Sequence, residues 1–178
     1  MKAIYLTRIL GIFFLITISI ISKAQFKLVK IGIDGLTCSA CSYGTEKSIR
    51  KLDFVKDVSM DLNNKIAEIK FVDGKQVSVE ALAQKVVDAG FSVRFITASF
   101  NFNNVAVSEN YKYPDGNNLF CFVKTTPKQL NGEITIQFIG SKYLSKTEYK
   151  KWKDIVYRAT PKTKELNFYS NIYFVTLP

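Results

Sequence analysis

Residues 26–52 read FKLVKIGIDGLTCSACSYGTEKSIRKL, and this stretch decides how the first half of the chain folds. The apolar residues over 26–33 are largely β-branched or alternate with polar ones, which predicts a strand that Asp34-Gly35 ends. Over 40–52 the apolar and small side chains recur at spacings of three and four, which is typical of a helix. Two cysteines, Cys38 and Cys41, span the loop after the strand and the start of that helix.

The residues that follow complete a compact unit. Alternating runs at 55–62 and 66–72 flank Asn63-Asn64, which predicts a hairpin. Ser78 can cap a second helix that Gly90 ends, and residues 91–97 return as a strand. The order βαββαβ predicts an α+β fold, a ferredoxin-like sandwich over residues 25–98, followed by a second small α+β region over 99–178.

The numbers of cysteine and histidine residues limit the kinds of catalytic or metal site that the chain can form. The 178 residues include three cysteines and no histidine. Without histidine, Ser-His-Asp and Cys-His catalysis are excluded, as are zinc and iron sites that need a histidine ligand. Three cysteines are also too few for a Cys₄ zinc site or for an iron–sulfur cluster held by one chain.

The two neighbouring cysteines remain as soft ligands. A cysteine at a helix N-terminus meets unpaired N–H groups and the positive end of the helix dipole, and both favour the thiolate. Two thiolates suit a soft ion of low coordination number, whereas zinc prefers four ligands. The leading prediction is Cu(I) bound by Cys38 and Cys41, with Hg(II) or Zn(II) as the alternatives.

The segment Gly35-Leu36-Thr37-Cys38-Ser39-Ala40-Cys41 resembles the metal-binding loop of the heavy-metal-associated domain family. That family includes copper chaperones, the N-terminal modules of copper-transporting ATPases and the periplasmic mercury-binding protein. The family loop generally has Met where this chain has Leu36, and the resemblance implies that this side chain packs beneath the loop. The segment Asp88-Ala89-Gly90-Phe91 also resembles the family and implies an aromatic ring beside the metal. The resemblance covers residues 26–97 and implies that Cys38 and Cys41 bind the ion.

Other roles for the cysteine pair stay open. It could be a structural disulfide or the site of a thiol–disulfide oxidoreductase, and the domain could be a non-catalytic interaction module. A thioredoxin fold needs a cis-proline facing its disulfide, but residues 25–113 contain no proline. The flanks of Cys38 and Cys41 also lack the Trp-Cys-Gly-Pro-Cys signature. We therefore expect that the chain is not an enzyme.

Residues 1–24 have the pattern of a secretory signal peptide. Lys2 and Arg8 precede an apolar run of 13 residues, and Ser22-Lys23-Ala24 supplies small residues for cleavage before Gln25. The run is shorter than the roughly 20 residues of a membrane-spanning helix, although an uncleaved anchor is the alternative reading. We expect a periplasmic or secreted chain without a stable membrane anchor after cleavage.

Residues 99–178 give fewer signals and resemble no family. The sequence predicts a linker over 101–104, strands over 119–124, 133–139 and 166–177, and a helix over 145–158. In that helix Ser145 is the expected cap, and Tyr149, Trp152, Ile155 and Val156 share one face. Cys121 lies in an apolar run, so a buried, inert side chain is expected, with a third metal ligand or a thiol for intermolecular pairing as the alternatives.

The charge is uneven along the chain. The net charge is +10, with 11 basic and 9 acidic side chains over 25–98 and 11 and 6 over 99–178. The basic residues follow no nucleic-acid recognition motif, so we expect no nucleic-acid partner. The sequence as a whole predicts an exported metallochaperone that passes its metal ion to a partner protein by thiolate exchange.

Overall fold

The computed structural model describes residues 26–161 and 168–178, and the predicted signal peptide over 1–24 lies outside them. The elements follow one another in the order β1 (Phe26–Asp34), α2 (Ser39–Ile49), β2 (Val55–Asp61), β3 (Ile66–Phe71), α3 (Val79–Asp88), β4 (Ser92–Val107), β5 (Lys112–Asp115), β6 (Asn118–Phe122), β7 (Lys128–Ile139), α4 (Lys146–Lys150), α5 (Lys153–Ala159) and β8 (Asn171–Thr176). Within these described residues, no helix is long and apolar enough to cross a membrane.

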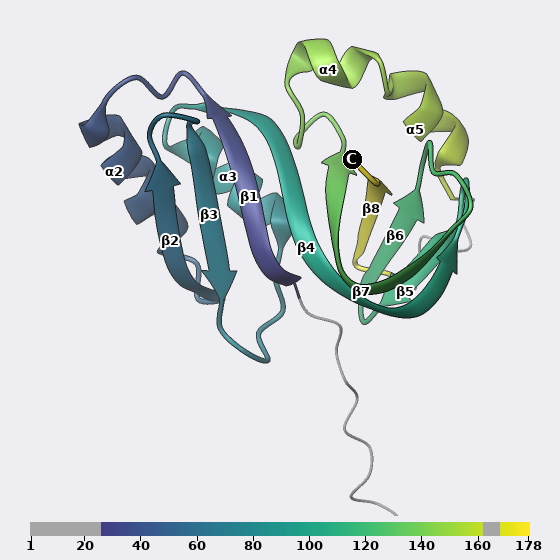
Figure 1. Ribbon diagram of the computed structural model, residues 1–178. Coiled ribbons are helices and arrows are strands. Elements are labelled where there is room, and N and C mark those ends of the chain that lie inside the picture. Colours follow the sequence, from purple (N-terminus) through teal and green to yellow (C-terminus); the bar gives the residue numbers. More distant parts are fainter. Residues whose placement is uncertain (1–25, 162–167) are drawn as a thin grey trace, which may run out of the picture.

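The first half, from β1 to the start of β4, has the βαββαβ order that the sequence predicts. β1 lies between β3 and β4 and is antiparallel to both, and β2 forms the outer edge beside β3. The two helices α2 and α3 lie against these strands (Figure 1). Ile49 of α2 and Leu82 of α3 are fully buried with Ile31 of β1. The ferredoxin-like prediction is confirmed.

The predicted linker over 101–104 is wrong, because these residues continue β4. This strand is 16 residues long and pairs antiparallel with β7 from Thr97↔Gln137 to Val107↔Lys128. Phe100 and Phe102 are buried while the asparagines between and after them are exposed, which is the alternation of a half-buried strand. A register shift between Phe102 and Val105, where Asn104 has φ 52°, interrupts the pairing without ending the strand.

Strand β4 joins both halves into one eight-stranded sheet. The strand order is β2-β3-β1-β4-β7-β8-β6-β5. In the second half β7 is antiparallel to β8, β8 is parallel to β6, and β6 is antiparallel to β5. Figure 1 shows that these strands curl around, whereas β1, β2 and β3 form a more open layer. The sheet is therefore continuous across residues 98 and 99.

The hydrophobic core is continuous as well. Phe26 of β1 contacts the rings of Phe100, Phe120 and Phe138 at centroid distances of 5.5, 5.9 and 6.0 Å. Tyr173 of β8 also packs on Phe120 and Phe138. The part of the core under α2 and α3 is mostly aliphatic and the curled part is mostly aromatic, and the two parts merge at β1 and β4.

A smaller core lies under α4 and α5. The predicted inward face of the helix is confirmed, and the cluster consists of Val123, Ile139 and Leu144 with Phe95, Tyr149, Trp152, Ile155, Val156, Ala159 and Phe174. Ser145 caps α4 as predicted, by accepting a hydrogen bond from the Glu148 amide. The single helix expected over 145–158 is instead two, because the amides of Lys151 and Trp152 bond the carbonyls three residues earlier, in tight turns that break the regular helix.

Phe95 connects this smaller core to the first half. Phe95 belongs to the cluster under α4 and α5, while its neighbour Ile96 belongs to the main core, because adjacent residues of a strand point to opposite faces. The Phe95 ring lies over Gly32 of β1, and a Cβ at position 32 would come within 3.0 Å of three ring carbons. Leu144 forms an isolated antiparallel β-bridge with Phe95, and the Ser145 amide donates a hydrogen bond to the Arg94 carbonyl at 3.0 Å. These contacts seat the start of α4 beside the start of β4.

Candidate metal centre

The loop between β1 and α2 places the two cysteines side by side. Gly35 takes φ +87°, which only glycine adopts easily, and the chain then turns into α2 with Cys38 as its N-cap residue. The Cys41 amide donates to Cys38 Sγ at 3.1 Å, and the two Cα atoms are 5.2 Å apart. In this structure the two sulfurs are joined as a disulfide.

The two cysteines differ in their exposure to solvent. Cys38 is exposed and Cys41 is half-buried against the main core. The first turn of α2 contains no acidic side chain, so the unpaired N–H groups of the helix N-terminus favour negative charge on the sulfurs without local opposition. This arrangement leaves Cys38 Sγ open to an incoming ligand once the disulfide is reduced.

Two apolar side chains support the loop from beneath and beside. Leu36 is buried at 3% exposure and belongs to the main core, as the resemblance implies. Phe91 lies beside Gly35, since a Cβ at position 35 would be 3.5 Å from its ring. The Phe91 amide donates to the Val86 carbonyl at 3.2 Å, which holds the ring's backbone at the end of α3.

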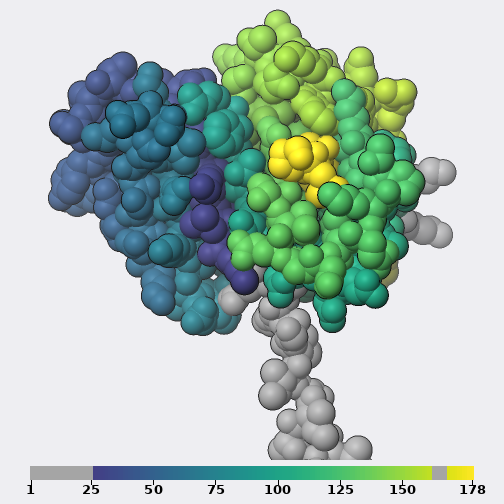
Figure 2. Space-filling view, viewed as in Figure 1, coloured from purple at the N-terminus to yellow at the C-terminus, as the bar shows by residue number. Residues whose placement is uncertain are grey.

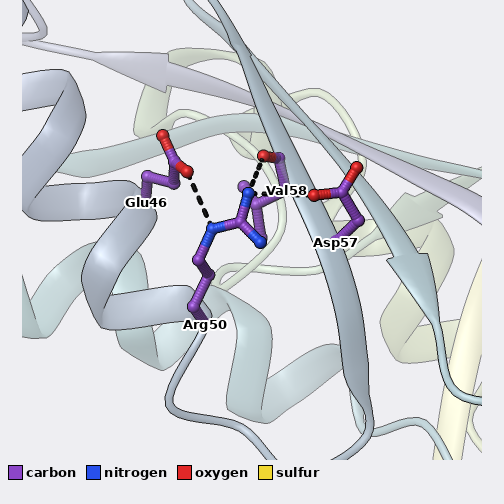
Figure 3. A network of polar contacts seen from close by, with 4 residues as sticks. All are labelled: Glu46, Arg50, Asp57 and Val58. Atoms are coloured by element: carbon purple, nitrogen blue, oxygen red, sulfur yellow. Dashed lines mark hydrogen bonds and ion pairs between the residues drawn. The ribbon is translucent and has the colours of Figure 1, made fainter.

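Polar contacts fix the direction of α2. The Thr45 hydroxyl, which is fully buried, donates to the Cys41 carbonyl at 3.0 Å. At the far end Arg50 bonds Glu46 at 2.7 Å, Asp57 at 2.9 Å and the Val58 carbonyl at 2.6 Å, which ties the helix to β2 (Figure 3). The hydrogen bond from Arg50 lowers the pKa of the Asp57 carboxyl. Sequence reasoning missed Thr45 and Arg50, although a threonine four residues after a helical cysteine is a recognisable signal.

The third cysteine is not part of this arrangement. Cys121 is buried at 1% exposure in β6, which is separated from β1 by three other strands of the sheet order. The expectation of a buried cysteine is confirmed. Among residues 26–161 and 168–178, no group of three or more Cys, Asp or Glu side chains could hold a metal ion. The structure thus brings together Cys38 and Cys41 and leaves Cys121 apart, so the described part of the chain offers an ion two sulfur ligands.

Comparison with known proteins places this loop in a family. Residues 30–92 match the family model described as the heavy-metal-associated domain. Copper-transporting ATPase 1 of Rhizobium meliloti is 39% identical over 83 residues, which are 44% of this chain and 10% of the ATPase. A probable copper-transporting ATPase of Arabidopsis thaliana, HMA5, is 36% identical over 81 residues, 46% of this chain and 8% of the ATPase. The chain therefore spans about a tenth of the length of these curated relatives.

Solved structures also match part of the chain. The CopZ metallochaperone is 22% identical with a TM-score of 0.36, covering 38% of this chain and 98% of CopZ. Oxidized MerP from Ralstonia metallidurans CH34 is 34% identical with a TM-score of 0.35, covering 39% of this chain and 97% of MerP. The family match, the βαββαβ order and the cysteine loop after β1 agree with one another. Residues 30–92 form a heavy-metal-associated domain.

Proposed function

We propose that this chain is an exported metallochaperone that binds one Cu(I) ion between Cys38 and Cys41 and passes it to a partner protein. The observation that supports this most strongly is the position of the two cysteines, side by side at the accessible N-terminus of α2. This pair lies within a domain whose curated relatives are copper-transporting ATPases. A binding and transfer role fits this domain better than catalysis.

The donor set fits Cu(I) better than the other metals. Two thiolates satisfy a soft monovalent ion, and the same pair can hold Hg(II), whereas Zn(II) would need further ligands. The disulfide must first accept two electrons and two protons from a dithiol reductant, because only the thiolates are ligands. Loading then releases the two thiol protons as Cu(I) binds.

Transfer follows from the low coordination number. A thiolate of the partner adds to the two-coordinate ion before Cys38 or Cys41 leaves, so copper remains Cu(I) and bound throughout. The exposed Cys38 is the sulfur that such a ligand reaches first. Export, and with it a periplasmic or secreted location, rests on the signal-peptide pattern of residues 1–24.

A thiol–disulfide oxidoreductase is the second candidate function, since the disulfide between Cys38 and Cys41 is the product such an enzyme would form. The first proline after the loop is Pro114, in β5 at the opposite edge of the sheet from β2. Pro114 is therefore not placed beside the cysteine pair as the proline of a thioredoxin is. We expect negligible insulin reductase activity from the reduced chain.

The test is a Cu(I) titration of reduced residues 25–178 under anaerobic conditions, against a chromogenic Cu(I) chelator. We expect about one ion per chain, lost in Cys38→Ser and in Cys41→Ser. Cys121→Ser is the matched control, because it removes a thiol that is buried away from the loop, and it should keep full binding. Full binding by the Cys38→Ser/Cys41→Ser protein would refute the site. Tight Zn(II) but weak Cu(I) binding would refute the metal, and insulin reduction that depends on Cys38 would favour the oxidoreductase.

A further inference from the structure

The positive charge of the second half is concentrated in one segment. Residues 99–178 have a net charge of +5, of which residues 141–159 contribute +4. The basic members of this segment are Lys142, Lys146, Lys150, Lys151, Lys153 and Arg158, and the acidic members are Glu148 and Asp154. The segment comprises α4, α5 and the turn before them, so most of the net charge of the second half lies on one local part of the surface.

These charges point outward and are only partly compensated. All six basic side chains are exposed, while the apolar side chains of α4 and α5 other than Tyr157 pack on the smaller core. Lys142 pairs with Glu80 and Lys151 pairs with Glu148. Within residues 26–161 and 168–178, no ion pair involves Lys146, Lys150 or Lys153. Three lysines of this surface are therefore available to an external anion.

The segment lies at the end of the sheet where the metal loop begins (Figure 1). Lys146 and Asp34 line the same cavity of about 520 Å³, between α3 and the turn before α4, and Asp34 directly precedes Gly35 of the loop. Figure 1 shows α4 at the same end of the sheet as the loop between β1 and α2, and in Figure 2 the light-green surface of the segment adjoins the teal start of β4. The carboxylates at this cavity have cationic neighbours, because Glu80 pairs with Lys142 and Asp34 lies 4.0 Å from Arg94.

We infer that residues 141–159, called here the basic face, form a docking surface for an acidic protein surface on the metal-transfer partner. This inference rests on the proposed transfer function. Opposite charges speed the encounter of two proteins and fix their relative orientation. A partner that binds the basic face with acidic residues is held at the end of the sheet where the loop that carries Cys38 begins (Figure 1). The heavy-metal-associated half has a net charge of only +2, so the second half supplies most of the attraction.

A protein is favoured over a membrane as the occupant. An amphipathic helix that enters a bilayer needs an apolar face toward the lipid, and α4 and α5 turn theirs to the smaller core. Tyr157, at 82% exposure, is the exposed large apolar side chain of this segment. One aromatic ring is a small anchor compared with the stripe of such a helix.

The experiment compares two synthetic acceptors for Cu(I). Both contain a Cys-x-x-Cys motif; one has a tail of eight glutamates and the other a Gly-Ser tail of equal length. When copper moves, the acceptor's two thiols release two protons, Cys38 and Cys41 take up two, and copper stays Cu(I). We expect the copper-loaded chain to transfer at least tenfold faster to the acidic acceptor at low salt, and at equal rates to both at 0.5 M salt.

Two triple variants locate the effect. Lys146→Glu/Lys150→Glu/Lys153→Glu reverses the available lysines of the basic face, and it should reduce the preference for the acidic acceptor to less than twofold. Lys51→Glu/Lys56→Glu/Lys70→Glu is the matched control, with the same change in net charge at exposed lysines of the first half. The control should keep the preference. Equal loss in both variants, or an unchanged preference in the first, would overturn the inference.

Two further measurements separate the outcomes. Lys124 lies 4.7 Å over the ring of Trp152, the one tryptophan of the chain, so its fluorescence reports anions that bind the basic face. Titration of the metal-free Cys38→Ser/Cys41→Ser chain with the acidic tail alone tests docking even if Cu(I) binding fails, and wild-type affinity is expected. Tighter binding to phosphatidylglycerol vesicles than to the tail, lost in the first triple variant, would overturn the protein partner in favour of a membrane.

Discussion

The two halves of the sheet solve the problem of burying a core in different ways. The first half covers one face of its strands with α2 and α3 and fills the space with aliphatic side chains such as Ile31, Ile49 and Leu82. The second half curls its strands and fills the interior with rings, among them Phe120 and Tyr173. This difference explains why the fold of the first half can be predicted from the sequence. The apolar face of an amphipathic helix is a local sequence pattern, whereas a cluster of aromatic rings is assembled from strands that are distant in the sequence.

The two halves of the sheet have no sharp structural boundary between them. β4 pairs with β1 on one edge and with β7 on the other, and Phe26 of β1 packs into the aromatic cluster of the second half. Each half thus completes the core of the other. The predictions below test how far the two halves depend on one another.

The largest effect is expected from Phe100→Ala. Phe100 is 1% exposed and contacts rings of both halves, so its removal should lower the free energy of unfolding by about 3–5 kcal/mol. Urea unfolding followed by Trp152 fluorescence and by far-UV circular dichroism should give coincident transitions in the wild type and in the variant. Phe168→Ala, at a ring with 82% exposure, is the control and should change stability by less than about 0.5 kcal/mol. Separate transitions would show that the halves unfold independently.

Leu36→Asp sharpens the comparison at the metal loop. It places a carboxylate in the aliphatic core without a partner, which should cost about 3 kcal/mol of unfolding free energy. Leu36→Met has nearly the same volume and should cost less than about 1.5 kcal/mol, with Cu(I) affinity nearly unchanged. The unfolding midpoint and the Cu(I) affinity of both variants test whether Leu36 packs in the core beneath the loop. Wild-type stability in Leu36→Asp would show that the loop is not packed on the core.

The smallest effect is a loss of stability at high pH that originates in the second half. Burial raises the pKa of Tyr173 to about 12, and it raises the pKa of Tyr143 as well. The folded state therefore keeps the phenol protons after the unfolded chain has lost them near pH 10. This stabilisation is complete below pH 10 and is lost as pH rises toward 12, by about 2–3 kcal/mol for Tyr173.

Denaturant unfolding between pH 9 and 12 measures this slope. Tyr173→Phe should reduce it, and Tyr157→Phe, at a ring with 82% exposure, should leave it unchanged. The same slope in Tyr173→Phe as in the wild type would place the alkaline sensitivity elsewhere in the molecule.

The sequence was informative where its signals were local. The helix caps at Ser78 and Ser145 and the cysteine loop follow from short patterns, the packing of Leu36 follows from the family resemblance, and the structure contains them. The prediction for residues 101–104 was wrong because asparagines usually mark turns, and the burial of the Phe102 ring between them becomes clear only once β7 is paired alongside. The nearness of Lys146 to Asp34 is a property of the folded chain that no spacing in the sequence encodes.

The ring of Phe95 over Gly32 has a consequence for how this chain can vary. The missing side chain at position 32 is the space that the Phe95 ring fills, and that ring is also part of the base on which α4 and α5 rest. A larger residue at position 32 is tolerable only together with a smaller one at position 95. A smaller residue at position 95 in turn weakens the packing of α4 and α5 on the second half. Positions 32 and 95 are therefore free to change as a pair and constrained singly, so compensating substitutions in related chains would trace the junction of the two halves.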